Sequence, residues 1–569
     1  MAAKVKAGPP DLIFFDGNIL TGTRLKAGDA DATPGRVSAV AVRGGKIMAV
    51  GADAAMLALK DSHTKTIDLK GAFAMPGFND AHTHMASAGR QKMSVDLDNV
   101  PSLAAMLAKV QAYAARLGPG EWILGGGWDH TKWAGAKLPT RQDLDAVSGG
   151  HPAFLERTDG HIAVANSAAL KAAGITDATI APKGGAIDRD ADGQATGILR
   201  EGPTLALMEK VIPAPSLATR RQSIELAMQD ALSHGVTSIQ DFSDWEDFLA
   251  MEEMEDKGTL HLRIAEWVDF NLPVGVLDER RRSHPANDLL LHTTMLKAFM
   301  DGSLGSRTAA MNEPYSDDPN NSGIARYDQG KLNEMAAARA ADGFQLGFHA
   351  IGDLANDMAL NAMSAAEQVG RPANVAAAPR NADGDVVTAG QAVVRPRDFR
   401  FRIEHAQVVS AGAFERFAQL GVIASMQPSH LLTDMAWAPA RLGPEREKRA
   451  YAWKSFLDHG VTLAFGTDYP VESISPFRGL YAAITRQNVE GTQTFEPQEK
   501  LTIDEAIYAY TQASAFAEFR ETLKGRLEPG FLADMVVLDR DIMKASAQEV
   551  LHTQVLRTVV GGETVYEAR

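Results

Sequence analysis

Two histidines separated by a single residue, His82 and His84, lie in the segment MPGFNDAHTHM. On an extended strand alternate side chains point to the same face, so both imidazoles would be presented together. Imidazole nitrogens are common ligands of zinc and related metals, and one ion can use two of them. Because the chain has 15 histidines, such a pair also arises readily by chance. The pair alone therefore leaves a metal site and a coincidence open.

Four further ionisable residues each lie in or directly after an apolar run that is typical of a buried strand. They are Lys297 in TMLKAFMDG, His349 in FQLGFHAIGD, His405 in FRIEHAQ and Asp468 in GVTLAFGTD. For any one histidine the usual alternative is a core residue that bonds to a backbone carbonyl. Several such residues at strand ends together favour a convergent active site.

The elements that must position these residues are alternating apolar runs and helical patterns. The eight runs are AFAMPGFNDAH, GVTSIQD, LRIAEWVD, TMLKAFMDG, FQLGFHAIGD, FRIEHAQ, GVIASMQPSH and GVTLAFGTD. Alternation of strands with helices predicts a parallel sheet, and eight strands can close into a barrel. We therefore expect an α/β protein with a (β/α)₈ TIM barrel, whose active site lies where the strands end.

The two chain ends differ from the centre in their sequence pattern. Short strand-like segments fill residues 1–75 and 522–569, with Gly44-Gly45 and Gly561-Gly562 as hairpin turns. We expect these ends to form one composite β-sandwich and residues 76–521 to form the barrel. Residues 95–230, after the first strand, interrupt the alternation and are expected to form an inserted substrate or lid subdomain.

Composition limits the partners and the metal ligands. The chain has no cysteine, so a metal would be held by His, Asp, Glu or a modified Lys. A formal net charge of −15 argues against nucleic acid, and no basic amphipathic stripe suggests a membrane surface. A small-molecule partner is expected, and a homo-oligomer, dimeric or higher, stays open. Without a signal-like segment the sequence predicts a cytoplasmic protein, or a periplasmic or secreted one if a signal peptide was removed.

Longer phrases support a more specific interpretation. They include PTRQDLDAVSGGHP, DGHIAVANSAAL, KAFMDGSLGSRTA, HAIGDLANDMAL, RIEHAQVV, MQPSHLLTDM, GTDYPVESISP and LEPGFLADMVVLD. Together with HTH after MPGF, these phrases resemble the amidohydrolase superfamily, and within it the YtcJ-like branch that includes N-substituted formamide deformylase. The resemblance covers nearly the whole chain.

The resemblance implies a role for each strand-end residue. His82 and His84 would bind a first, more buried metal, and His349 and His405 a second. Lys297 would bridge the two as a carboxylated lysine, because an ammonium group has no lone pair to offer. Asp468 would bind the first metal and transfer protons. One or two divalent ions are implied, with Zn²⁺ favoured.

The implied chemistry is hydrolysis of a C–N bond in an amide, N-acyl or N-formyl compound by metal-activated hydroxide. A deaminase or a cyclic-amide, carbamate or lactone hydrolase would use the same residues. A non-catalytic scaffold protein is the alternative from another class. Such relatives have usually lost ligands, whereas all six positions are kept here, which favours an enzyme.

Other residues are weaker candidates for substrate binding. Trp128, Asp129 and Trp133 in GGGWDHTKW would line an aromatic pocket or anchor the inserted subdomain. His161, after Asp159-Gly160, would contact substrate or play a structural part.

Further candidates follow the later strands. Gln427 and His430 after the seventh strand, and Glu472 after Asp468, would lie on the active-site side of the barrel. Arg307 in GSLGSRTAA would bind a polar substrate group or fix a loop.

Overall fold

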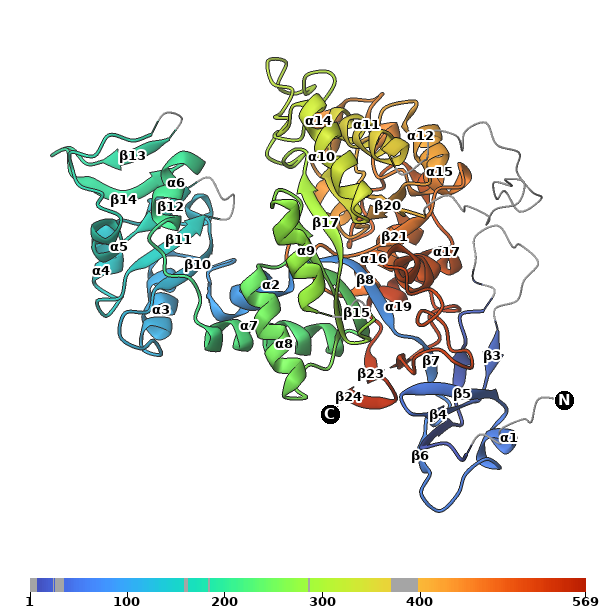
Figure 1. Cartoon of the computed structure of the whole chain (residues 1–569). Helices are drawn as coiled ribbons and strands as arrows, with labels where there is room; N and C mark the ends of the chain where they lie inside the picture. Colours follow the sequence, from blue (N-terminus) through green and yellow to red (C-terminus); the bar gives the residue numbers. More distant parts are fainter. Residues whose placement is uncertain are drawn as a thin grey trace. The chain divides into compact units, whose positions relative to one another are not determined.

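The computed structural model describes residues 8–23, 25, 35–157, 162–182, 185–284, 287–369 and 398–569. The chain forms two compact units (Figure 1). The first consists of Met1–Met85 with Met228–Arg569, and the second of Ala86–Ala227. Each unit is described by itself.

The first unit is built on an eight-stranded parallel sheet with the order β21-β20-β19-β18-β17-β16-β15-β8. Its strands are β8 (Phe78–Thr83), β15 (Val236–Asp241), β16 (Arg263–Asp269), β17 (Leu291–Phe299), β18 (Gln345–Ala350), β19 (Arg402–His405), β20 (Ile423–Met426) and β21 (Leu463–Phe465). Each strand overlaps one of the eight predicted runs, in the same order. The predicted α/β barrel fold is confirmed.

The first and last strands meet at a seam formed just beyond β21. The backbone N–H of Asp468 donates to the carbonyl of His82 at 2.8 Å, and that of His84 donates to the carbonyl of Tyr469 at 2.7 Å. A parallel bridge joins Thr83 to Tyr469. The eight-stranded sheet is therefore almost closed, and the seam brings distant parts of the sequence together.

Helices follow the strands, as the βα pattern predicts (Figure 1). They include α8 (Trp245–Asp256), α9 (Val274–Ser283), α10 (Gln329–Ala341), α11 (Asp353–Val369), α12 (Ala413–Leu420), α15 (Trp453–Asp458), α16 (Pro476–Thr485) and α17 (Ile503–Tyr508). Local sequence sets their starts: Asp328 caps α10 by accepting from the backbone N–H of Lys331. Thr502 and Glu505 form a capping box at α17.

Strands from both chain ends share a sheet beside the barrel. One sheet has the order β5-β4-β1-β6 and the other β24-β23-β22-β7-β2-β3. Their bounds are β1 (Leu12–Phe15), β2 (Asn18–Leu20), β3 (Arg36–Val37), β4 (Ala39–Arg43), β5 (Lys46–Gly51), β6 (Lys65–Asp68), β7 (Phe73–Pro76), β22 (Met535–Leu538), β23 (Val555–Val560) and β24 (Glu563–Glu567). β22 pairs antiparallel with β7. The predicted domain bounds, 1–75 with 522–569 and 76–521, stay a prediction.

The second unit has its own six-stranded mixed sheet, with the order β13-β14-β12-β11-β10-β9. Its strands are β9 (Val95–Asp96), β10 (Ile123–Trp128), β11 (Ala153–Arg157), β12 (Ile162–Ala165), β13 (Ala186–Arg189) and β14 (Ala195–Arg200). The helices α3 (Leu103–Ala114), α4 (Arg141–Asp145), α5 (Ser167–Ala172) and α6 (Gly202–Glu209) accompany them. Two clusters of buried apolar residues give this unit a core of its own.

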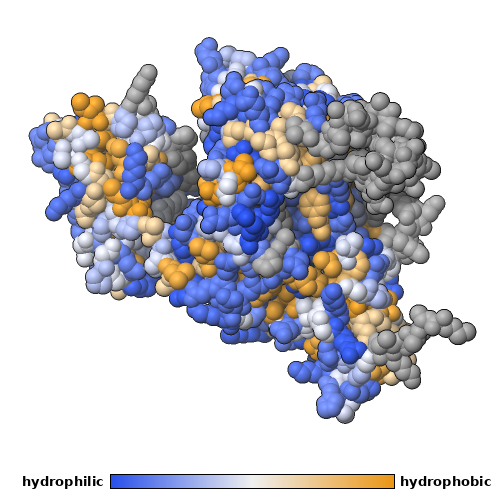
Figure 2. Space-filling view, viewed as in Figure 1, coloured by the Kyte–Doolittle hydropathy of each residue, from blue (hydrophilic) through white to orange (hydrophobic). Residues whose placement is uncertain are grey.

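Among the described residues, no helix is long and apolar enough to cross a membrane. In the face shown in Figure 2, hydrophilic side chains cover much of the surface, and hydrophobic ones form small areas between them.

Candidate metal centre

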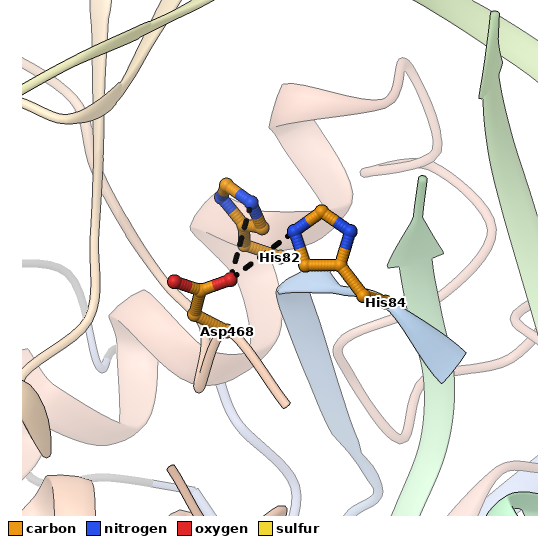
Figure 3. A group of neighbouring side chains, drawn as sticks. All are labelled: His82, His84 and Asp468. Atoms are coloured by element: carbon orange, nitrogen blue, oxygen red, sulfur yellow. Dashed lines mark ion pairs between the residues drawn. The ribbon is translucent and has the colours of Figure 1, made fainter. Parts of the chain in front are cut away.

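Two neighbouring histidines and a carboxylate converge at the seam of the barrel. His82 belongs to β8, His84 follows it, and Asp468 follows β21. The Oδ1 atom of Asp468 lies 3.6 Å from Nε2 of His82 and 3.3 Å from Nε2 of His84. Figure 3 shows the two rings and the carboxylate pointing toward one another. The spacing of two at the end of β8 therefore presents both imidazoles to one point.

Hydrogen bonds on the far side of each ring fix these two imidazoles. Nδ1 of His82 donates to Oε2 of Glu404 at 2.8 Å, and Nδ1 of His84 donates to the carbonyl of Phe242 at 2.9 Å. With Nδ1 protonated, the lone pair of a neutral imidazole lies on Nε2, which faces Asp468. Partners of this kind orient the histidine ligands of metal ions.

Lys297 lies beside this cluster, buried in β17 with its side chain fully enclosed. Its Nζ is 3.0 Å from Nε2 of His82 and lies over the rings of Trp267 and Phe299, 5.0 Å from each centroid. Burial lowers the pKa of the ammonium group to about 8. A neutral amine, unlike an ammonium, has the lone pair needed to react with carbon dioxide.

Asp301, the carboxylate nearest to Lys297 in the sequence, is engaged elsewhere. Its carboxylate accepts from the backbone N–H groups of Ala310, Ile351 and Gly352. In the described part of the chain no carboxylate oxygen forms an ion pair with Nζ of Lys297. A structural cation paired with a carboxylate is therefore disfavoured.

His349 and His405 form the second half of the centre. Their ring centroids are 4.4 Å apart, and the ring of His405 is 5.0 Å from that of His82. Nε2 of His349 donates to the carbonyl of Gly302 at 3.0 Å, which leaves its Nδ1 with the lone pair. Nδ1 of His405 is buried without a hydrogen-bond partner among the described residues. Both rings thus carry a nitrogen that is free to bind a metal ion.

His430 joins this group, although the sequence placed it only among the pocket residues. Its Nε2 lies 3.5 Å from Oδ2 of Asp468, and its ring stacks on that of His405 with a centroid distance of 5.8 Å. A nitrogen from each ring and an oxygen of Asp468 lie within 4.8 Å of one another. The three residues form a second set of atoms that could hold an ion.

The electrostatics of the centre suit ligands rather than buried ion pairs. Burial, followed by the charge of Lys297, lowers the pKa of His82 to about 4 and that of His349 to about 3. Burial also holds the pKa of His405 well below its usual value. For Asp468 burial favours the neutral form, but His82 and His84 outweigh it and hold its pKa well below the usual range. Burial disfavours the charged form of His84, but Asp468 outweighs it and raises the pKa of this imidazole. The neutral imidazoles of His82, His349 and His405 near an ionised carboxylate are donors that a divalent cation binds.

The backbone is strained at two of these positions. His405 has a φ of 73° and Asp468 a φ of 60°, both in the left-handed region that other residues than glycine rarely adopt. Such conformations cost on the order of 1–3 kcal/mol and cluster at functional sites. Here they end the strand alternation of β19 and turn the chain after β21, so that both side chains reach the centre.

Two of the remaining barrel candidates lie close to the centre. Nε2 of Gln427 is 3.3 Å from Nδ1 of His82 and donates to the carbonyl of Ser425. Glu472 is buried and accepts from Oγ1 of Thr433 at 2.9 Å, and burial raises its pKa. Whether either one contacts substrate stays a prediction.

Arg307 has a structural partner. Its guanidinium forms an ion pair with Asp317 at 2.8 Å, and Arg441 pairs with the same carboxylate. These contacts account for the loop-fixing alternative, and the predicted substrate contact stays a prediction.

The candidates in the second unit also have structural partners. Trp128 and Trp133 are buried in the apolar core, and their indole N–H groups donate to the carbonyls of Leu155 and Val100. Asp129 forms an ion pair with Arg157 at 2.7 Å. The alternative of anchoring the inserted subdomain accounts for these contacts, and their role in substrate binding stays a prediction. His161 lies outside the described residues.

Sequence reasoning missed the residues that support the histidines. Besides holding His82, Glu404 accepts from Nε of Arg402 at 2.5 Å, and both are fully buried. The ring of Trp267 lies 5.1 Å from that of His82. The available signal was a pair of charged residues, Arg402 and Glu404, in the apolar run FRIEHAQ. A buried strand keeps charged residues only when they are paired.

A cavity of about 250 Å³ lies at the ends of β15 and β16. Its lining includes Phe242, Trp245, Trp267, Glu266 and Arg280. Two of these residues also touch the centre: the ring of Phe242 contacts that of His84, and the ring of Trp267 contacts that of His82. The cavity and the centre thus share aromatic walls.

The chain is similar to three curated proteins over most of its length. It is 35% identical to "Protein LONG AFTER FAR-RED 3" of Arabidopsis thaliana, over 98% of this chain and 91% of that protein. It is 29% identical to "Putative amidohydrolase YtcJ" of Bacillus subtilis, over 96% and 98%. It is 27% identical to "N-substituted formamide deformylase" of Arthrobacter pascens, over 98% of each chain.

Among solved structures, an uncharacterized metal-dependent hydrolase from Pyrococcus horikoshii aligns with a TM-score of 0.76 and 28% identity. The alignment covers 94% of this chain and 99% of that one. The family model described as "Amidohydrolase family" matches residues 65–566. These agreements in sequence and fold confirm the resemblance seen in the motifs, and the chain belongs to the amidohydrolase family.

Proposed function

We propose that this protein hydrolyses a C–N bond of an amide, N-acyl or N-formyl compound, with one or two divalent metal ions at the barrel seam. The observation that carries the proposal is the convergence of His82, His84 and Asp468 within 4.8 Å, with Lys297 and His405 beside them. Family membership supports a hydrolase. The relative named as a formamide deformylase supports the bond type.

The donor set fits zinc better than magnesium or calcium, because imidazole nitrogen outnumbers carboxylate oxygen. His82, His84 and Asp468 would hold one ion, and His349 and His405 a second, with Lys297 bridging them as a carbamate. When bound, such ions lower the pKa of water to about 7 and polarise a carbonyl oxygen. His430, through its 3.5 Å approach to Asp468, is a further candidate ligand or substrate contact.

Asp468 is the group that moves the proton. Asp468 is ionised, with Oδ1 facing His84 and Oδ2 facing His430. One of these two carboxylate oxygens can therefore receive a proton from the attacking water. It then delivers that proton to the departing nitrogen, which leaves as an amine. Glu404 and the carbonyl of Phe242 keep the rings of His82 and His84 in the required orientation.

The substrate is proposed to be a small molecule with an aromatic or apolar group. The cavity lined by Phe242, Trp245 and Trp267 supports this choice, because aromatic walls favour an apolar group and shield the centre from water. Hydrolysis of a cyclic amide, carbamate or lactone, or deamination, would use the same groups, so the released product separates these reactions.

The test is a panel of N-formyl, N-acyl, cyclic-amide and amino-heterocycle compounds offered to metal-loaded protein. Release of an amine from N-formyl or N-acyl compounds is expected, and release of ammonia alone would point to a deaminase. Chelation should abolish the reaction and added Zn²⁺ should restore it. Full turnover by protein that elemental analysis shows to be free of metal would refute the proposal.

A further inference from the structure

A second cluster of histidine and carboxylates lies on different elements of the barrel unit. Glu252 and Glu255 belong to α8, His284 follows α9, and Asp288 precedes β17 (Figure 1). None of these residues takes part in the metal centre described above.

One ring nitrogen of His284 is held by a hydrogen bond, and the other faces two carboxylates. Its Nδ1 donates to Oε1 of Glu252 at 2.8 Å. Its Nε2 lies 3.6 Å from Oε2 of Glu255 and 3.9 Å from Oδ2 of Asp288. His284 is only 7% exposed, and its Nε2 has no hydrogen-bond partner among the described residues. A buried polar atom is therefore aimed between two carboxylates.

Among the described residues the charge nearest to balancing these carboxylates is that of Arg263, which acts on Asp288 electrostatically but forms its ion pair with Asp534. With Nδ1 protonated, a neutral His284 presents a lone pair on Nε2 to the two carboxyl groups. Burial, followed by the charge of Asp288, raises the pKa of Glu255 to about 7, and these two carboxyl groups also share a hydrogen bond. Within the described ranges, neither Glu255 nor Asp288 forms an ion pair with a lysine or arginine. The neighbouring arginines of α9 are engaged: Arg280 lies over Trp245, and Arg281 pairs with Asp278.

A protonated His284 would supply a charge but would fit the distances poorly. Separations of 3.6 and 3.9 Å exceed the usual range of about 2.7–3.2 Å for an N–H···O hydrogen bond. They agree better with two atoms that bind the same ion. Ligands at about 2.0–2.2 Å from a tetrahedral zinc lie roughly 3.3–3.6 Å from one another. The 3.6 Å separation lies at the upper limit of this range, and the 3.9 Å separation lies slightly above it.

We propose that Glu255, His284 and Asp288 bind a divalent transition-metal ion such as Zn²⁺ at a second, non-catalytic site. Two carboxylates balance the charge of the ion, and Glu252 orients the imidazole as carboxylates do behind histidine ligands. Water completes the coordination, since Glu255 and Asp288 are partly exposed. The ion links the C-terminal part of α8 to the segment that leads into β17. The site therefore stabilises this part of the barrel.

The test counts zinc bound to the full chain. Wild-type protein, His284→Gln and Glu255→Gln are saturated with Zn²⁺, freed of unbound metal and analysed by elemental analysis. Glu253→Gln is the matched control, because this residue lies on the same helix but pairs with Lys257. Wild type and control should hold one more zinc per chain than the two variants, and hydrolytic activity should stay within about two-fold in all four.

Thermal unfolding gives an independent readout. Added Zn²⁺ should raise the Tm of wild type and Glu253→Gln by several degrees more than that of His284→Gln or Glu255→Gln. If one variant fails to fold, the other carries the comparison. Equal zinc content and equal Tm shifts in all four proteins would overturn the proposed site. The same holds if Glu253→Gln loses as much zinc as His284→Gln and Glu255→Gln.

Discussion

The strand ends of the barrel and the segment GGGWDHTKW of the second unit make an instructive comparison. Both regions held candidate site residues, chosen by residue type and, for the strand ends, also by their place in or after an apolar run. The strand-end residues converge at one point, whereas Trp128 and Trp133 are buried in the core of their own unit. A parallel barrel fixes the direction in which the last residue of each strand points. An inserted segment gives no such frame, so residue type there cannot separate packing from recognition.

We expect Lys297→Ala to cause the broadest loss, because both the bound metal and the activity should fall. Without the proposed bridge the ions lose a shared ligand, and metal assistance is worth several kcal/mol, or on the order of 10³-fold in rate. Metal content, measured by elemental analysis, and kcat should fall together. Formate or acetate should restore part of both by replacing the carbamate.

Lys454→Ala is the control, because this lysine pairs with Asp458 on the surface. Full metal content in Lys297→Ala would show that the lysine is not a bridge.

For Asp468→Asn, kcat should fall by roughly 10² to 10⁴, because an amide can neither accept nor return a proton. Thermal stability should change little, since none of the described backbone N–H groups donates to this carboxylate. Steady-state kinetics with a compound that the wild type hydrolyses measure this change in kcat, and Asp458→Asn is the control. A kcat within a few-fold of wild type would remove Asp468 from the mechanism.

Trp128→Ala should show the opposite pattern, with a large effect on stability. It removes a fully buried indole and its hydrogen bond to Leu155, which costs about 3–5 kcal/mol in a core. Denaturant unfolding followed by circular dichroism measures the loss. Trp128→Phe keeps most of the packing and should leave KM unchanged. A several-fold rise in KM for that variant would instead support a substrate contact.

Arg307→Ala should have the smallest effect. Its ion pair with Asp317 is accessible to solvent, and exposed ion pairs contribute little to stability. The free energy of unfolding should therefore change little, with KM unchanged. A ten-fold rise in KM at unchanged stability would assign Arg307 to the substrate pocket.

The sequence predicted the barrel because eight apolar runs alternate with helical patterns and nearly all of these runs finish in a polar or ionisable residue. It also singled out His82, His84 and Asp468, whose positions follow from strand register. It did not predict the support of His82 by Glu404, because strand alternation places Glu404 and His405 on opposite faces. The left-handed backbone of His405 breaks that alternation.

The cluster of Glu255, His284 and Asp288 was missed for a related reason. Glu255, His284 and Asp288 belong to a helix and a connecting segment whose meeting depends on packing. No periodicity in the sequence expresses that contact. Residues placed by strand register are therefore more predictable than residues placed by the packing of helices.

The seam between β8 and the residues after β21 has a consequence for biosynthesis. His82 and His84 emerge from the ribosome early, whereas Asp468 emerges only after seven further strands of the barrel. The backbone bonds between Asp468 and His82 form only when the last strand docks on the first. An ion that needs all three side chains can be captured only by a finished barrel. Tightly held metal in a cell extract would thus report completed folding rather than mere synthesis.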